Sequence, residues 1–419
     1  MHRTAIARVA ACILISAIAP RAVAQALSLD EAIRIGEGRS ARVAAQSSAV
    51  TAASDLAGRA AQLPDPKLKF GLENVPVSGE DAWSLTRDFM TMKLIGVMQD
   101  IVNGDKRKAR SERAARELGV EQAGLVLERA NLRRDIALAW YDTLHATRAL
   151  EVMSDLVNAV ALQQDTVAAA IAAGRAPPAD GFMARSAVEA ARDQVIDQVR
   201  VLARARIALS VLVGDDAQRP VGEAPDTARL AVPVSALLES LDRQPALQVL
   251  ESRTALARSD VAVAQSTKIP DWGVELSYGQ RSPNFSNMLS LMFSVDLPIA
   301  PAKRQDREVA ASLAQVERAR AQLEEARRAY AAQVRGLAVD WEAWNKRVQR
   351  FEQLLVPLAR ERAEVALASY RGGKGELMAV IEARKAEAET RLGLHNALLE
   401  RGRAWAGLNY LVPQEEARQ

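Results

Sequence analysis

The side chains with the clearest coordination chemistry in this sequence are methionines. Five of the nine fall on two strand-like segments, one in each half of the chain: Met90, Met92, Met98, Met288 and Met292. All five carry even numbers, so an extended backbone places those of each segment on one face. Thioether sulfur favours soft cations such as Cu(I) and Ag(I). One hypothesis is therefore a weak, transient soft-metal lining, and the other is that flexible methionines fill apolar gaps.

The sequence offers no set of residues for catalysis. Beyond residue 24 it contains no cysteine and only two histidines, His145 and His395, and it lacks a glycine-rich phosphate loop and a serine nucleophile motif. Aspartates and glutamates recur at helical spacing beside arginines, which is typical of a solvated helix face. We therefore expect neither an enzyme nor a bound cofactor.

The first 24 residues have the features of a secretory signal. A basic start precedes a short apolar run at 9–20, and small residues at 22–24 predict cleavage before Gln25. The order of these features argues against lipid attachment at Cys12. Three arginines lie in the segment, and their removal from the 55 basic residues would leave 52, equal to the 52 acidic ones. This balance argues against a nucleic-acid binder.

The rest of the chain divides into two units with one plan. We expect a first repeat at 25–213, a linker rich in proline, glycine and aspartate at 214–233, a second repeat at 234–412 and a polar tail at 413–419. Each repeat begins with a helix, continues with a strand hairpin and ends with two long helices joined by a tight loop. The expected strand hairpins are 67–101 and 272–298, and the expected helical hairpins are 104–213 and 301–411.

The long helices exclude an ordinary globular domain. The stretches 104–173 and 302–371 mix charged and apolar residues throughout, and Pro357 interrupts the second. About 70 helical residues span roughly 105 Å at 1.5 Å per residue. A pattern of this length indicates coiled-coil packing and predicts a mainly helical protomer.

The expected strands have two unlike faces. In the segment 288–297, leucine, phenylalanine and valine at odd positions oppose serine and aspartate at even positions. About ten residues with this alternation are typical of a transmembrane β-strand, although a half-buried soluble sheet gives the same pattern. Four strands cannot close a barrel, and an open sheet edge cannot lie in lipid. A membrane interpretation therefore requires several subunits, each contributing four strands.

Several motifs resemble the TolC family of outer-membrane efflux proteins. They are LSLDEAI at 27–33, LPDP at 63–66, GDKRKAR at 104–110, AGRAPPAD at 173–180 and YRGGKGELMAVIEAR at 370–384. Together with the duplicated plan, they extend the resemblance over nearly all of the chain after residue 24. LENVPVSGE at 72–80 and GDKR at 104–107 suggest the heavy-metal branch of this family, whose members couple to metal-exporting RND pumps.

The resemblance implies a homotrimer in the outer membrane of a Gram-negative cell. Twelve strands would form a β-barrel in outer-membrane lipid, and an α-helical barrel would extend from it through the periplasm. The expected function is the exit duct of a tripartite efflux system for heavy-metal cations, with a periplasmic adaptor (a membrane fusion protein) and an inner-membrane RND pump as partners. Alternatives are a duct for drugs or small organic molecules, a type I secretion channel, and a periplasmic coiled-coil adaptor.

The resemblance also implies where such a duct closes. Asp180 matches the family's aspartate at the loop tip, and Tyr370 matches the tyrosine that it engages. Glu382 matches an acidic residue that faces the lumen at a cation-sensitive constriction. The alternative for Glu382 is an ordinary surface glutamate paired with Lys385 or Lys374.

Two positions depart from the family's gate. Gly375 stands where a gating arginine is familiar, and Ala379 stands where a second constriction acid would be. Arg371 and Lys374 are the candidates to replace that arginine.

The loops that join the long helices are expected to reverse the chain and to meet the adaptor. Gly174, Gly372 and Gly373 permit the reversal, and Pro177 suits the first turn of the following helix. With Arg175, these residues form the tip surface that the resemblance assigns to adaptor contact.

Overall fold

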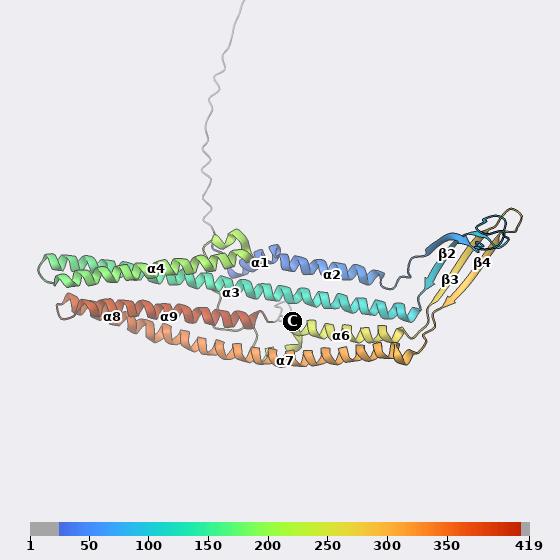
Figure 1. Ribbon diagram of the computed structural model, residues 1–419. Coiled ribbons are helices and arrows are strands. Elements are labelled where there is room, and N and C mark those ends of the chain that lie inside the picture. The colour runs from blue at the N-terminus through green and yellow to red at the C-terminus, as the bar shows by residue number, and fades with distance from the viewer. Residues whose placement is uncertain (1–24, 412–419) are drawn as a thin grey trace, which may run out of the picture.

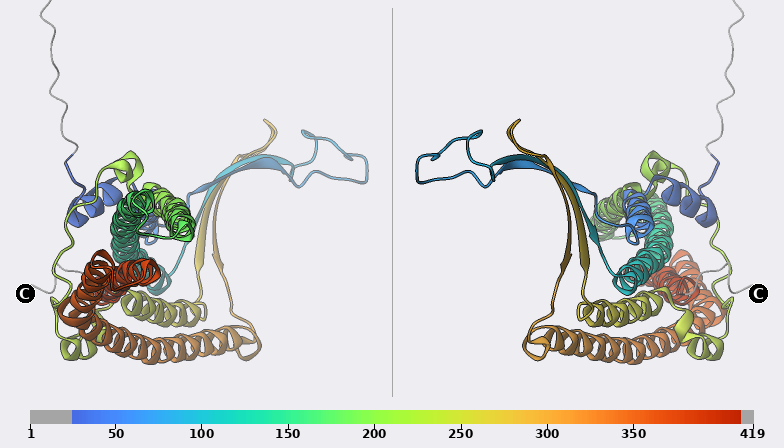
Figure 2. Two further views of the ribbon diagram at one scale, coloured as in Figure 1. Left: turned by 90° about the vertical axis from the view of Figure 1, so that its left-hand side faces the viewer. Right: turned by 90° about the vertical axis from the view of Figure 1, so that its right-hand side faces the viewer.

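A computed structural model describes residues 25–411. The predicted signal segment with Cys12 and the polar tail at 413–419 lie outside these residues. Figure 1 shows an elongated protomer with long helices and a small sheet at one end. Viewed along the long axis, the helices form a curved wall, and the sheet continues from one side of it (Figure 2). Within residues 25–411, no helix is long and apolar enough to span a membrane.

The first repeat supplies two long helices and one strand hairpin. Its elements are α1 (Leu29–Arg39), α2 (Ala41–Arg59), β1 (Lys67–Glu73), β2 (Met92–Ile101), α3 (Gly104–Ala172) and α4 (Pro178–Val213). α3 begins where Asn103 caps it, because the Asn103 side chain accepts a hydrogen bond from the Asp105 N–H at 2.8 Å.

The second repeat has the same order after a short linker. Its elements, with those of the linker, are η1 (Gly214–Gln218), α5 (Val234–Glu239), η2 (Leu241–Arg243), α6 (Pro245–Ser266), β3 (Trp272–Gln280), β4 (Met288–Val295), η3 (Pro301–Lys303), α7 (Gln305–Arg350), α8 (Val356–Arg371) and α9 (Leu377–Asn409). A π-helical turn, Phe351–Leu355, separates α7 from α8 just before Pro357. The expected stretch 302–371 is therefore two helices, because the proline and the wider turn break the regular hydrogen bonding.

The four strands form one antiparallel sheet in the order β1-β2-β3-β4. When Asp100 is aligned with Asp296, and Asp65 with Asp271, the two hairpins have the same register. Lys67 pairs with Met98 in the first hairpin as Gly273 pairs with Ser294 in the second. At the other end of the hairpins, the pair Glu73–Met92 corresponds to the pair Gly279–Met288. The duplication therefore holds at the level of individual residue pairs.

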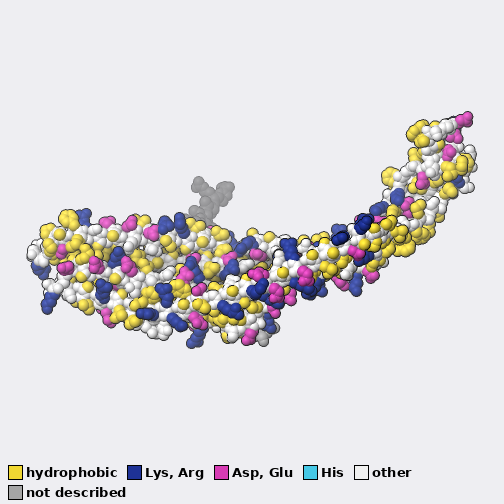
Figure 3. All heavy atoms as spheres, turned by 60° about the horizontal axis from the view of Figure 1, so that its bottom comes forward, with side chains coloured by type: hydrophobic (Ala, Val, Ile, Leu, Met, Phe, Trp, Pro, Cys, Tyr) yellow, Lys and Arg dark blue, Asp and Glu magenta, His cyan; other side chains and the backbone are white. Residues whose placement is uncertain are grey.

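The register gives the sheet one apolar and one polar face. The apolar face carries large exposed side chains from all four strands: Leu68, Phe70, Leu72, Ile95, Val97, Ile101, Trp272, Leu276, Tyr278, Leu289, Leu291, Phe293 and Val295. The opposite face carries charged residues, serines, glycines and methionines. In Figure 3, hydrophobic side chains gather at the sheet end, whereas both signs of charge are scattered over the helices.

α3 lies at the centre of the helical part. It packs against α4 and α9 towards the loop tips, and against α2 and α6 towards the sheet. The main core lies midway along α3, where Trp140 and Tyr141 are fully buried and their rings meet edge to face at 5.3 Å. Gly402 on α9 allows this packing, because a Cβ there would lie 2.9 Å from the Tyr141 ring.

A tryptophan at a matching position in each repeat fixes the segment that enters it, and in the second repeat Trp405 also donates to the Arg229 carbonyl at 3.0 Å. Trp140 follows the start of α3 by as many residues as Trp341 follows the start of α7. The Trp140 indole N–H donates to the Leu27 carbonyl, and the Trp341 indole N–H donates to the Thr227 carbonyl, both at 2.9 Å. The same anchor therefore holds the segment just before α1 in the first repeat and the linker before the second repeat.

We expect loss of either indole donor to destabilise the protomer. Replacing Trp341 with phenylalanine leaves the Thr227 carbonyl without its partner, which costs about 1–3 kcal/mol when the group is buried. The Leu27 carbonyl keeps the Gly222 N–H as a donor, but replacing Trp140 with phenylalanine removes one of its two hydrogen bonds and leaves a cavity in the core. The cost should be larger for Trp140, which is fully buried. Thermal unfolding in detergent measures it, and midpoints equal to that of the parent protein would contradict the anchoring role.

Candidate functional site

The polar face of the sheet carries charges that are compensated between strands. Lys67 Nζ lies 2.7 Å from Asp100 Oδ2, and Lys69 Nζ lies 2.5 Å from Glu275 Oε2. The second pair joins β1 to β3, so the lysine reaches across β2. This face is hydrophilic but holds no large excess of one charge, which suits a passage more than a tight binding site.

Four of the five methionines lie on this face. The register places Met98 and Met292 opposite Glu275 from its two sides, and Met288 opposite Gly279. A Cβ on Gly279 would lie 2.5 Å from the sulfur of Met92, so Met92 lies across that glycine. The structure thus places methionines on both sides of β3 at two levels, beside Glu275 and beside Gly279. The close approach of Met92 to Gly279 is also what the gap-filling hypothesis predicts.

Met90 does not share this face. It lies in the loop before β2, where its N–H donates to Asp88 Oδ1 at 2.7 Å. The prediction that it belongs to the strand was wrong, because the chain is not extended at this position and the even-number rule fails there.

The two loop tips repeat one geometry. Gly174 and Gly373 have φ angles of +67° and +71°. The next N–H groups, those of Arg175 and Lys374, donate to the carbonyls of Ala170 and Ser369 at 2.9 and 3.0 Å. This is the glycine-terminated helix end in which the left-handed residue closes the last turn.

Two details of the tips differ from the prediction. Gly372 has a φ of −79°, so Gly373 alone supplies the left-handed conformation of its loop. Pro177 precedes α4 as its cap residue, and Pro178 occupies the first helical position. Two adjacent prolines made this boundary ambiguous, since either fits the start of a helix.

Tyr370 lies in a small apolar cluster that joins the helices at the tips. It packs beside Val167, Ala184 and Leu377, which come from α3, α4 and α9. Burial raises the pKa of the Tyr370 phenol, and the nearby charge of Asp180 raises it further. The structure therefore places Asp180 near Tyr370, although no hydrogen bond joins their side chains in the described protomer.

The remaining gate residues lie at or near the same end. A Cβ on Gly375 would approach Ser369 Cβ and the Tyr370 nitrogen at 3.1 Å, so close packing explains the glycine at the position of the familiar arginine. Glu382 is exposed, and among residues 25–411 it forms no ion pair. Lys385 lies 3.8 Å from Glu389 instead, and Arg371 and Lys374 are also exposed.

A histidine pair that the sequence does not predict lies in the contact between the repeats. His145 on α3 and His395 on α9 have ring centroids 6.5 Å apart, and the Nδ1 atom of each lacks a hydrogen-bond partner within residues 25–411. They line a cavity of about 420 Å³ between α3, α4 and α9. Burial lowers the pKa of His145 to about 3, helped by His395 and Arg403. Burial also lowers the pKa of His395.

Two ion pairs flank these histidines along the contact between α3 and α9. Arg403 Nη2 lies 2.8 Å from Asp142 Oδ1, and Arg391 Nη2 lies 2.8 Å from Asp155 Oδ2. The only sequence signal for the contact was that each repeat carries one histidine on a long helix.

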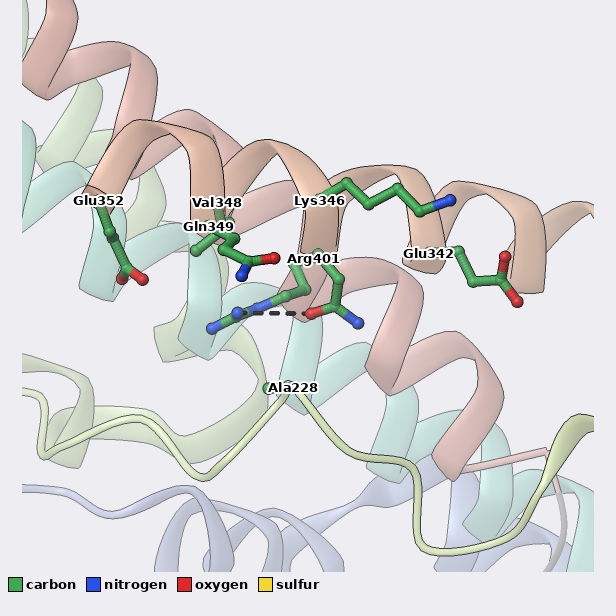
Figure 4. A pocket seen from close by; sticks show the side chains of 8 residues that line it. Ala228, Glu342, Lys346, Val348, Gln349, Glu352 and Arg401 are labelled. Atoms are coloured by element: carbon green, nitrogen blue, oxygen red, sulfur yellow. Dashed lines mark hydrogen bonds between the residues drawn. The ribbon is translucent and has the colours of Figure 1, made fainter. Parts of the chain in front are cut away.

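A second cavity, of about 470 Å³, lies between the linker and the helices α7 and α9 (Figure 4). Arg401 reaches across it, donating to Thr227 Oγ1 at 3.0 Å and to Asn345 Oδ1 at 3.5 Å. Burial lowers the pKa of Arg401. These contacts fasten the linker to the helices, so we assign the cavity a structural role.

The protomer thus combines two long helical hairpins with a four-stranded sheet that has one apolar face. Residues 236–412 match the family described as Outer membrane efflux protein. The chain is 22% identical to the cobalt-zinc-cadmium resistance protein CzcC of Cupriavidus metallidurans, over 89% of this chain and 87% of that protein.

Solved structures share the fold. A CusC structure aligns with a TM-score of 0.78 and 15% identity, covering 93% of each chain. The outer membrane protein VceC of Vibrio cholerae aligns with a TM-score of 0.74 and 16% identity, covering 91% of this chain and 94% of VceC. These matches confirm the resemblance to the TolC family and the fold class of the protomer.

We expect acid to loosen the contact between the repeats. An unfolded histidine has a pKa near 6.5, whereas His145 has a pKa of about 3. Between these values the unfolded chain binds more protons, so stability falls as the pH falls from about 6.5. Thermal midpoints measured between pH 7.5 and 4 should drop less in a His145→Gln, His395→Gln variant. An identical pH dependence in parent and variant would contradict the assignment.

Proposed function

We propose that this chain is the subunit of a trimeric exit duct in the outer membrane of a Gram-negative cell. The observation that carries the proposal is the sheet, which presents a continuous apolar face from four strands and ends in two open edges. A soluble protomer would leave this face in water, and a single protomer in lipid would leave the edges unpaired. Association of several protomers in a membrane satisfies both requirements.

The helical part supports a periplasmic extension. Its surface carries interspersed charges of both signs, so it is suited to water and not to lipid (Figure 3). α3 alone has 69 residues, which corresponds to roughly 100 Å at 1.5 Å per residue. The tips at Gly174 and Gly373 lie at the end remote from the sheet, where a periplasmic adaptor and an RND pump would dock.

For the cargo we propose heavy-metal cations. The similarity to a protein named for cobalt, zinc and cadmium resistance supports this class. The row Met98, Glu275 and Met292 on the polar face supports a soft cation within it, because thioethers prefer Cu(I) and Ag(I). Lys69 compensates Glu275 and would keep any binding weak, as transport through a duct requires.

A deletion strain complemented with variants tests the cargo. The parent gene should restore growth on cobalt, zinc, cadmium, copper or silver salts but not on a panel of drugs. A Met98→Leu, Met292→Leu variant should lose resistance to copper and silver selectively, because leucine keeps the volume and removes the thioether. Met153→Leu, in the helical core, is the matched control. If the parent gene restores growth only in the presence of drugs, the metal cargo is contradicted and small organic molecules are the cargo.

If Asp180 and Tyr370 form the closure contact, its loss should make the closed duct leak. We expect Tyr370→Phe and Asp180→Asn to raise the conductance of the protein in planar bilayers. The reason is that neither variant can form the proposed closure contact between the carboxylate and the phenol. Tyr330→Phe on α7 is the matched control and should conduct like the parent. Unchanged conductance in both tip variants would show that Asp180 and Tyr370 do not keep the duct closed.

A further inference from the structure

We propose that the cavity between α3, α4 and α9 binds a small organic acid, that is, an anion with an apolar body. This cavity contains the pair His145 and His395 and has a volume of about 420 Å³. Pockets for small molecules have volumes of roughly 300–1,000 Å³. A ligand there would contact both repeats, because α3 and α4 belong to the first repeat and α9 belongs to the second. Binding at this site would not depend on the cargo of the proposed duct.

The cavity lies on a side of α3 that the entering segment leaves free. Trp140 donates to the Leu27 carbonyl, so its side of α3 faces that segment. At 3.6 residues per turn, Asp142, Ala146 and Ala149 lie on the opposite side of the helix, and all three line the cavity. A ligand can therefore reach the cavity without displacing the segment around Leu27.

The lining combines apolar walls with a few polar groups. Val201 of α4 and Leu392 and Leu399 of α9 supply apolar contact, and alanines of α3 and α4 leave the space between them. The amides of Gln198 and Asn396 and the two imidazoles supply hydrogen-bonding groups. An apolar pocket with a small number of polar groups suits an organic molecule, whose apolar body fills the space, better than a bare ion.

The uncompensated charge in the cavity is positive. Arg403 already has partners, because it forms ion pairs of 2.8 Å with Asp142 and of 2.7 Å with Glu400. Arg204 also lines the cavity and forms no ion pair among residues 25–411. A guanidinium group can donate two hydrogen bonds to one carboxylate. An organic acid would therefore supply the partner that Arg204 lacks in the described protomer.

The two histidines are arranged as donors to such an anion. His145 is only 8% exposed, and the Nδ1 atom of each ring is buried without a partner within residues 25–411. A neutral imidazole carries a proton on one nitrogen only, and a buried N–H without an acceptor is costly. The proton therefore belongs on Nε2, which is the ring nitrogen left to donate to a ligand in the cavity.

A metal ion fits the same residues less well. A cation bound at Nε2 would force the proton onto Nδ1, whereas metal-bound histidines normally donate that N–H to an acceptor. Burial lowers the pKa of His145, and so do His395 and the positive charges of nearby arginines. These surroundings oppose a cation and favour an anion. No group of three or more His, Cys, Asp or Glu side chains suited to a metal ion occurs within the described residues.

Equilibrium dialysis with 4-benzoylbenzoate tests the site. The full-length protein in a neutral detergent should bind this acid more tightly than 4-benzoylbenzamide, which has the same apolar body and no charge. Arg204→Gln should weaken binding of the acid about tenfold or more, because a hydrogen bond to a charged group is lost, and should leave binding of the amide unchanged. Arg204 is exposed, so this variant should fold. Arg200→Gln, which breaks an ion pair with Asp197 on the same helix, is the matched control and should bind like the parent.

Photolabelling with the same acid locates the site, because the benzophenone group cross-links to nearby residues under light. Mass spectrometry should find the label on peptides from 142–149, 198–208 and 392–403, which line the cavity. Ala208→Phe should reduce both binding and labelling, since the larger side chain would occupy the cavity from its exposed side.

Three results decide between an anion site, a metal site and neither. Tighter binding of the acid than of the amide, lost in Arg204→Gln and located in the cavity, would establish the anion site. Equal binding of acid and amide, equal binding by Arg204→Gln and the parent, or a label elsewhere would overturn it. The same dialysis with silver nitrate tests the metal. Silver binding that is lost in a His145→Gln, His395→Gln variant, without binding of the acid, would replace the anion site by a metal site.

Discussion

The structure depends on the pairing of extended strands whose two faces must meet different surroundings. Each strand alternates large apolar side chains with polar or small ones, and the common register adds these alternations into one apolar and one polar face. Backbone groups at the outer edges of β1 and β4 still need partners. A sheet with these properties is complete only when copies of it close on themselves and lipid covers the outside.

The long helices extend from one end of this sheet. α3 and α7 continue from the strands and carry the curvature of the sheet into a curved helical wall. Trp140 and Trp341 fasten the entering segments to these helices at matching places, so each repeat positions its hairpin in the same way. The contact between α3 and α9 then joins the repeats through buried aromatic residues, two ion pairs and the histidine pair.

Much of this architecture could be predicted from the sequence, because its signals are local and periodic. The alternation of Leu289, Leu291 and Phe293 with Ser290 and Ser294 gave the faces of β4, and the two similar loop sequences pointed to two helical hairpins. The sequence predicts less accurately at which residue a strand or helix begins. The sequence pattern predicts Met90 in a strand, but that strand starts two residues later, and it predicts Pro177 in a helix that starts at Pro178.

Contacts between distant segments had no sequence signal strong enough to find them. His145 and His395 come together because α3 packs on α9, and nothing in either local sequence specifies that neighbour. The role of Gly375 likewise became visible only in its approach to Ser369 and the Tyr370 backbone. The equal registers of the hairpins are also a tertiary property. They show that the two repeats correspond in their individual residue pairs and not only in the order of their elements.

The most direct measurement of the central claim is the environment of successive β4 side chains in a reconstituted bilayer. Spin labels placed one at a time from Leu289 to Val295 report collision with oxygen, which concentrates in lipid, and with a water-soluble nickel complex. We expect high oxygen accessibility at odd positions, which carry the apolar side chains, and high nickel accessibility at even positions. Uniform nickel accessibility along β4, with no alternation, would show that the sheet does not enter the membrane and would contradict the account.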